Sequence, residues 1–145
     1  MKFRRWLNES SGTLQSHLES LRQQMVQVAQ QVLNNWKEKP GRGACRQIAT
    51  AISNLIEQQF SWAYADETAE KGHTWILVAT RDEACEVDIP CWLYETSKKV
   101  GGGYAKWTVN NKAVLNPEDI RIWKIDYPDW TDDDIEQIFS GKPAF

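Results

Sequence analysis

The sequence predicts an α+β protein in which N-terminal helices pack on an antiparallel β-sheet. Apolar residues recur at helical spacing up to Phe60, whereas short β-rich segments separated by polar turns follow from His73 onward. Helices followed by strands in separate parts of a chain are typical of the α+β class. A length of 145 residues fits one domain. We therefore expect a single domain over residues 13–145, preceded by a flexible arm over residues 1–12.

Two segments have the spacing of amphipathic helices. The first runs from Leu14 to Trp36 without Gly or Pro and predicts one long helix, with His17 on its surface. A second helix is expected to begin at or just before Cys45, after the helix-breaking residues 40–43. The apolar positions of the first helix are Leu14, Leu18, Leu21, Met25, Val28, Val32 and Trp36, and those of the second include Ile48, Ile52 and Ile56.

The second half of the chain favours β-structure. The β-rich segment 73–79 and the alternating segment 85–89 flank the polar turn Arg81-Asp82-Glu83 and predict a hairpin. Residues 61–72, rich in charge, are interpreted as a surface connection with at most a short strand near residues 62–64. A second hairpin around Asn110-Asn111, a strand over 121–125 and a final helix capped by Thr131 are also expected.

Composition and charge exclude several classes of function. Lys and Arg number 17 against 20 Asp and Glu, for a formal net charge of -3, so an extended cationic surface for nucleic acid is not expected. No apolar run has the length of a membrane span, and the basic N-terminus has no apolar stretch behind it. Three cysteines, an odd number, do not suggest a disulfide framework. We expect a cytoplasmic protein with free thiols that binds neither nucleic acid nor membrane.

Cys45 has the setting of a reactive thiol. It follows the small residues Gly43 and Ala44 and opens the second expected helix. The positive end of the helix dipole favours a thiolate at this position, and the free backbone N–H groups can hold an oxyanion. The alternative interpretation is a small buried hydrophobic residue.

His73 and Asp88 lie on the two strands of the first expected hairpin. A turn centred between Thr80 and Arg81, with a loop of two or four residues, places Asp88 directly across from His73 on the same face. An odd loop length would separate them. A carboxylate beside an imidazole is the arrangement of base and orienting group that nucleophilic catalysis requires.

These residues resemble the transglutaminase-like branch of the papain-like cysteine-enzyme superfamily. Gly43-Ala44-Cys45 at a helix start, His73-Thr74-Trp75 at a strand start and Val87-Asp88-Ile89 on the next strand are similar to its Cys, His, Asp order. The resemblance covers about residues 41–90 and implies a papain-like core, with Cys45 as nucleophile, His73 as general base and acid, and Asp88 as the orienting residue. Candidate oxyanion or substrate contacts are Gln47, Trp36 and Trp75.

The resemblance also implies the reaction class. A thiolate attacks an amide or ester carbonyl, and water or an amine then resolves the acyl-enzyme. The implied substrate is a protein, a peptide or a small amide, and no cofactor or metal is implied. Two alternatives remain at the level of sequence. One is a catalytically inactive interaction module with the same fold, and the other is a zinc-stabilised domain using Cys45, His73, Cys85 and Cys91.

Overall fold

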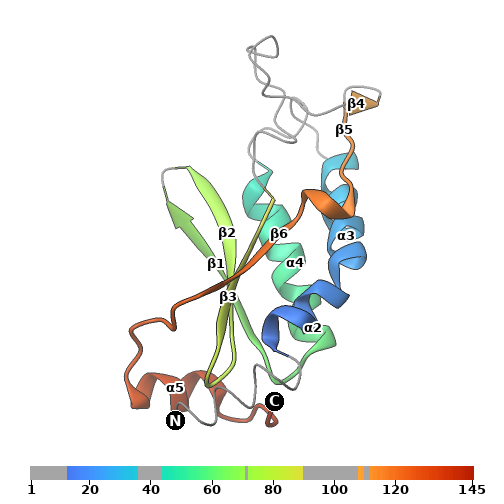
Figure 1. Cartoon of the computed structure of the whole chain (residues 1–145). Coiled ribbons are helices and arrows are strands. Elements are labelled where there is room, and N and C mark those ends of the chain that lie inside the picture. The colour runs from blue at the N-terminus through green and yellow to red at the C-terminus, as the bar shows by residue number, and fades with distance from the viewer. Residues whose placement is uncertain (1–12, 36–43, 71, 90–107, 110–111) are drawn as a thin grey trace.

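A four-stranded antiparallel sheet with the strand order β1-β2-β3-β6 forms the centre of the structure (Figure 1). The computed structural model describes residues 13–35, 44–70, 72–89, 108–109 and 112–145. Within these residues, three helices precede the sheet in sequence and lie on one side of it, which confirms the expected α+β class. The strands are β1 (Tyr64–Glu70), β2 (His73–Ala79), β3 (Ala84–Asp88) and β6 (Arg121–Ile125), and the helices are α2 (Leu14–Ser20), α3 (Arg22–Asn34), α4 (Cys45–Gln59) and α5 (Asp132–Phe139).

The main core lies between α4 and the sheet. Ile52 and Ile56 of α4 are fully buried, and they belong to the same cluster as Val78 of β2 and Val87 of β3. Burial of such side chains is worth roughly 1.5–3 kcal/mol each, so this contact contributes strongly to stability. The helix starts at Cys45 with Ala44 as its N-cap, as the sequence predicted.

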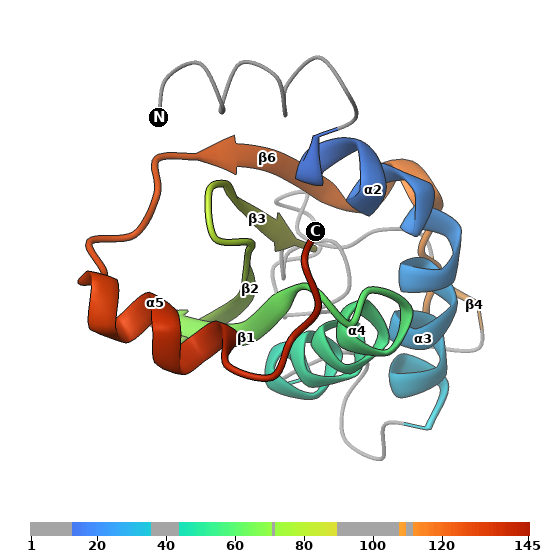
Figure 2. The same cartoon turned by 90° about the horizontal axis from the view of Figure 1, so that it is seen from below.

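The opposite face of the sheet is partly covered by α5. Phe139 of α5 packs with Ala79 of β2 and Ala84 of β3 in a second cluster. Figure 2 shows α5 on the other side of β1 and β2 from α3. Thr131 caps this helix, because its Oγ1 accepts from Asp134 N at 3.1 Å while the Asp134 carboxylate accepts from Thr131 N at 3.0 Å. The expected capping residue is confirmed.

The prediction of a single long helix from Leu14 to Trp36 is wrong, because the chain turns at Leu21 and forms two helices. The N–H of Leu21 bonds to the carbonyl of Leu18 at 3.0 Å, and the following helix starts afresh with Met25 N on Leu21 O at 2.8 Å. The turn lets α2 contact β6 while α3 contacts α4. The turn also changes which residues of α3 face the core, so that Leu33 is buried and Val32 is only partly buried. Trp36 lies outside the described residues.

The expected surface connection over 61–72 is also wrong, because most of it forms the edge strand β1. This strand pairs with β2 along its full length, from Tyr64 opposite Ala79 to Glu70 opposite His73. Its acidic residues are typical of an edge strand, where charge discourages pairing with another chain. Gly72 in the connection has φ 81°, a conformation that glycine adopts without steric cost.

The second expected hairpin is present in part, and the strand expected after it is present at its full length. The second hairpin consists of β4 (Thr108–Val109) and β5 (Lys112–Ala113), with Thr108 opposite Ala113. Its expected turn at Asn110-Asn111 lies outside the described residues, as does the expected arm over 1–12. The strand expected over 121–125 is confirmed as β6.

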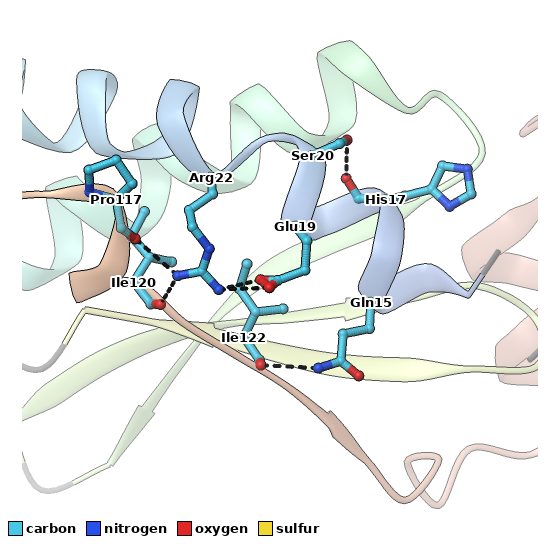
Figure 3. A network of polar contacts seen from close by, with 8 residues as sticks. All are labelled: Gln15, His17, Glu19, Ser20, Arg22, Pro117, Ile120 and Ile122. Carbon is cyan, nitrogen blue, oxygen red and sulfur yellow. Dashed lines mark hydrogen bonds and ion pairs between the residues drawn. The ribbon is translucent and has the colours of Figure 1, made fainter.

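Polar side chains of α2 and α3 hold the entry to β6 (Figure 3). The Arg22 guanidinium donates to the carbonyl of Pro117 at 2.9 Å and to that of Ile120, and it pairs with Glu19. Gln15 Nε2 donates to the carbonyl of Ile122 at 3.4 Å. Pro117 belongs to the short 3-10 helix η3 (Pro117–Asp119). These bonds tie η3 and the start of β6 to α2 and α3, whereas β6 itself pairs with β3.

Four residues, Thr80 to Glu83, join β2 to β3 between the paired Ala79 and Ala84. Thr80 Oγ1 accepts from the backbone N–H groups of Asp82 at 3.2 Å and Glu83 at 3.1 Å. The buried Glu83 carboxylate accepts from Leu14 N at 3.3 Å, at the start of α2. The loop is therefore bonded internally and to a helix.

We predict that Thr80→Val lowers the free energy of unfolding by about 1–3 kcal/mol, because two backbone donors lose a buried acceptor while side-chain shape is kept. Thr80→Ser retains the oxygen and is the matched control, with an expected loss of about 0.8 kcal/mol for the missing methyl group. Urea unfolding of the three proteins measures both values. Equal destabilisation by Val and Ser would contradict the bonding role of the hydroxyl.

Candidate active site

His73 and Asp88 lie on the face of the sheet that points away from α4. Ile76 and Val78 pack toward the helices, whereas Leu77 packs in the second cluster on the opposite face. Because side chains alternate along a strand, His73 shares the face of Leu77. Glu86 pairs with Leu77, so Asp88, two residues further, also lies on that face.

The predicted register of β2 and β3 is wrong by two residues, although the contact between His73 and Asp88 is present. Ile76 pairs with Val87, so Trp75 rather than His73 comes next beside Asp88. The loop has four residues but is centred one position later than expected. A shift of two preserves the face, and diagonal neighbours on a sheet remain within reach of long side chains.

The imidazole of His73 is bonded on one side only. Its Nε2 lies 2.8 Å from Oδ1 of Asp88, and the two side chains are 24% and 15% exposed. Its Nδ1 is buried and has no hydrogen-bond partner. An ionised Asp88 only accepts, so in the neutral ring the proton lies on Nε2 and the lone pair on Nδ1. The nitrogen that can accept a proton is therefore the unpartnered one.

Cys45 meets the same end of the sheet from the side of the helices. Its thiol donates weakly to the carbonyl of Gly72, with Sγ and O 3.9 Å apart, and its residue is 8% exposed. Gly72 directly precedes His73 in the chain. In the described part of the chain, no hydrogen bond joins the Cys45 thiol to the His73 imidazole. The two groups thus approach the start of β2 from its two faces.

The space beside the thiol is small. A cavity of about 10 Å³ is lined by Cys45, Ile48, Thr74 and Asp88 among others. That volume accommodates about one water molecule. Residues 36–43 and 90–107, which adjoin these elements in sequence, lie outside the described residues.

Trp75 lies beside the pair with its polar group already bonded. Its indole ring stacks on the His73 ring, with centroids 5.9 Å apart and planes 24° apart. Its Nε1 donates to Oε2 of Glu86 at 2.8 Å. In this structure Trp75 therefore contacts the imidazole and does not offer a free N–H to an oxyanion. Sequence reasoning missed Glu86, although the alternation of β3 places it on the face of Asp88.

The other candidate oxyanion donors are not assembled here. Gln47 is exposed on the first turn of α4, and Trp36 lies outside the described residues. The backbone N–H groups of Cys45, Arg46 and Gln47 precede the first intrahelical bond, from Ile48 N to Ala44 O at 2.9 Å. They carry the positive end of the helix dipole next to the thiol.

Cys85 lies deeper in the core than Cys45 and away from any helix terminus. It lies on the core face of β3 opposite Val78 and is 1% exposed. Burial, reinforced by nearby Glu83, raises the pKa of its thiol to about 12. Among the described residues, no three His, Cys, Asp or Glu side chains are grouped to hold a metal ion, and Cys91 of the zinc hypothesis lies outside them. The metal alternative gains no support from this geometry.

Comparison of the chain with protein-family models, curated proteins and solved structures finds no match. None of the helices in the part of the chain that the structure describes is long and apolar enough to cross a membrane.

We predict that iodoacetamide leaves Cys85 unmodified in the folded protein at about pH 8, because its pKa is raised to about 12 and only the thiolate reacts. Unfolding in urea should expose it to rapid modification, and mass spectrometry locates the label. The folded state also keeps this proton above the usual thiol pKa of about 8.5, so the free energy of unfolding should fall between about pH 8.5 and 12. A Cys85→Ala protein, which lacks this thiol, should lose less stability over that range. Labelling of folded Cys85 would contradict the assignment.

Proposed function

We propose that the protein performs thiol-dependent acyl chemistry on an amide or ester, with Cys45 as nucleophile, His73 as base and acid, and Asp88 as orienting residue. The observation that carries this proposal is the His73–Asp88 bond of 2.8 Å, which leaves a buried, unpartnered Nδ1 at the sheet end where Cys45 contacts Gly72. The three groups that such chemistry needs therefore meet the same end of β2, the thiol from the face covered by α4 and the His73–Asp88 pair from the opposite face.

The steps follow from the proton positions. His73 Nδ1 takes the thiol proton of Cys45, and the sulfur attacks the carbonyl carbon of the substrate. The C–N or C–O bond breaks, the leaving group takes the proton from Nδ1, and a thioester to Cys45 remains. Water, giving a proton to His73, then releases the acid, or an amine takes its place in acyl transfer. Asp88 stabilises the imidazolium that forms twice in this cycle.

The first turn of α4 supplies the groups that would stabilise the oxyanion. Its unbonded backbone N–H groups start at the nucleophile itself, so they lie near any carbonyl that the sulfur attacks. The thiol and the imidazole meet the start of β2 from its two faces, and no hydrogen bond joins them in the described structure, so the proposed chemistry requires the start of β2 to move and bring them together. Catalytic hydrogen bonds commonly tighten only when substrate is bound.

The burial of Cys45 favours a second candidate, an interaction module that keeps the fold without catalysis. A thiol that is 8% exposed beside a cavity of about 10 Å³ has no room for a substrate among the described residues. The two candidates differ in whether Cys45 reacts faster because of His73.

We predict that His73→Ala lowers the rate of Cys45 alkylation by iodoacetamide near pH 7 about tenfold or more, because the thiol loses its base. Asp88→Asn should lower the rate in the same direction, since an amide no longer stabilises the imidazolium. Asp66→Asn, which changes an exposed acid on β1, is the matched control and should leave the rate unchanged. Mass spectrometry separates the label on Cys45 from that on Cys85.

Hydrolysis of p-nitrophenyl acetate is the second measurement. Cys45→Ser should abolish turnover of this ester above the buffer rate, whereas Cys85→Ser should not. Equal alkylation of Cys45 in wild type and His73→Ala, together with no ester turnover in wild type, would reject catalysis and favour the interaction module.

A further inference from the structure

We propose that Glu86 is a positioning residue that acts through Trp75 to orient the His73 imidazole, an inference that rests on the proposed role of His73 as base. Glu86 Oε2 accepts the indole N–H of Trp75 at 2.8 Å, and the indole stacks on the imidazole with planes 24° apart. Glu86 itself touches neither Cys45 nor His73 by any hydrogen bond in the described structure. Its effect on the site passes through the ring of Trp75.

The two carboxylates of β3 bond across the hairpin in the same way. Glu86 pairs with Leu77 but bonds to Trp75, two residues earlier on β2. Asp88, which comes next to Trp75 in this register, bonds to His73, again two residues earlier. The two side-chain bonds thus cross the hairpin in the same diagonal direction, two residues apart along each strand. A single register fixes both of them.

The indole supplies the restraint that Asp88 cannot. The imidazole turns about its Cβ–Cγ bond, and one hydrogen bond at Nε2 limits this rotation only weakly, because Nε2 lies close to that axis. The rotation moves Nδ1 and, when it is large, stretches the bond to Asp88. A flat ring stacked on the imidazole limits the rotation. The indole could itself tilt, but its N–H is held by a carboxylate in a charge-assisted bond. Glu86 and Trp75 together therefore set where Nδ1 points.

The positioning role of Glu86 and a purely structural role in the hairpin predict different results. A support role would lower stability without changing which imidazole nitrogen carries the proton. The positioning role predicts that the ring rotates once the indole is released, so that the bond from Nε2 to Asp88 is made only part of the time and His73 exchanges between tautomers. The nitrogen shifts of the imidazole, observed by NMR on ¹⁵N-labelled protein, report this state without any substrate.

The experiment compares Glu86→Ala, Glu86→Gln and Trp75→Phe with wild type. In wild type above the pH at which the ring loses its charge, the ¹⁵N shifts should show the proton on Nε2. In Glu86→Ala and Trp75→Phe the two shifts should move toward each other, and Cys45 alkylation should slow about tenfold. Glu86→Gln keeps an oxygen that accepts the indole N–H and should restore both values. The double variant Glu86→Ala/Trp75→Phe should be no slower than either single variant, because both break the same link.

Glu70→Gln is the matched control for charge alone. Glu70 lies directly across from His73 on β1, so this variant removes a nearby negative charge without altering the indole bond. It should leave the tautomer and the alkylation rate unchanged. Trp75→Phe keeps the Glu86 charge, so an effect shared with Glu86→Ala cannot come from that charge.

The outcomes separate this inference from the proposed function. Unchanged nitrogen shifts in folded Glu86→Ala and Trp75→Phe would overturn the positioning role, whatever the activity of the protein. In a second outcome, the nitrogen shifts move in Glu86→Ala and Trp75→Phe, but the rate of Cys45 alkylation is the same in wild type and His73→Ala. That outcome would support the positioning of the imidazole and reject the thiol as its partner. Failure of Glu86→Gln to restore the wild-type shifts would also overturn the role assigned to the carboxylate.

Discussion

The candidate site depends on one constraint, the even number of residues that joins β2 to β3. A hairpin loop of four residues between Ala79 and Ala84 sends His73 and Asp88 to the same face, and one residue more or fewer would send them to opposite faces. The loop is held at that length by Thr80, whose oxygen binds two of its backbone N–H groups, and by Tyr127, whose hydroxyl donates to the Thr80 carbonyl at 2.7 Å. Because side chains alternate along both strands, the parity of the loop alone decides which face His73 and Asp88 share at the far end of the hairpin.

The sequence predicted the parts of the fold that depend on pattern and missed those that depend on tertiary contact. The start of α4 at Cys45, the strand pair of His73 and Asp88 and the Thr131 cap all follow from spacing and residue type. The break in the helix at Leu21 could not be predicted, because no Gly or Pro lies there. It follows from the separate tertiary contacts of α2 and α3. The register of the hairpin could not be fixed either, since the centring of the loop is set by bonds from Thr80 and Glu83 that pattern does not reveal.

The placement of the thiol follows from where α4 begins. A helix packed across a sheet buries its middle, so a nucleophile can adjoin the strand ends only if it lies at a helix terminus. Cys45 is the first residue of α4, and its thiol reaches the Gly72 carbonyl at the start of β2. The same position gives the sulfur the unbonded N–H groups of the first turn. Cys85, on the middle of the core face, has neither feature, and burial raises its pKa to about 12.

Asp88 and Glu86 of β3 bond to different kinds of ring, and this difference limits what His73 and Trp75 can do. Asp88 bonds to a ring that can gain and lose a proton, so in the proposed mechanism its charge acts on the chemistry. Glu86 bonds to an indole that does not titrate, so in its proposed role its charge acts on the position of the ring alone. Because the Trp75 N–H is occupied by Glu86, it is not free to stabilise an oxyanion while it holds the imidazole. In the proposed mechanism, stabilisation of the oxyanion therefore falls to the N–H groups that begin α4 at Cys45, which are the donors nearest to the sulfur along the chain.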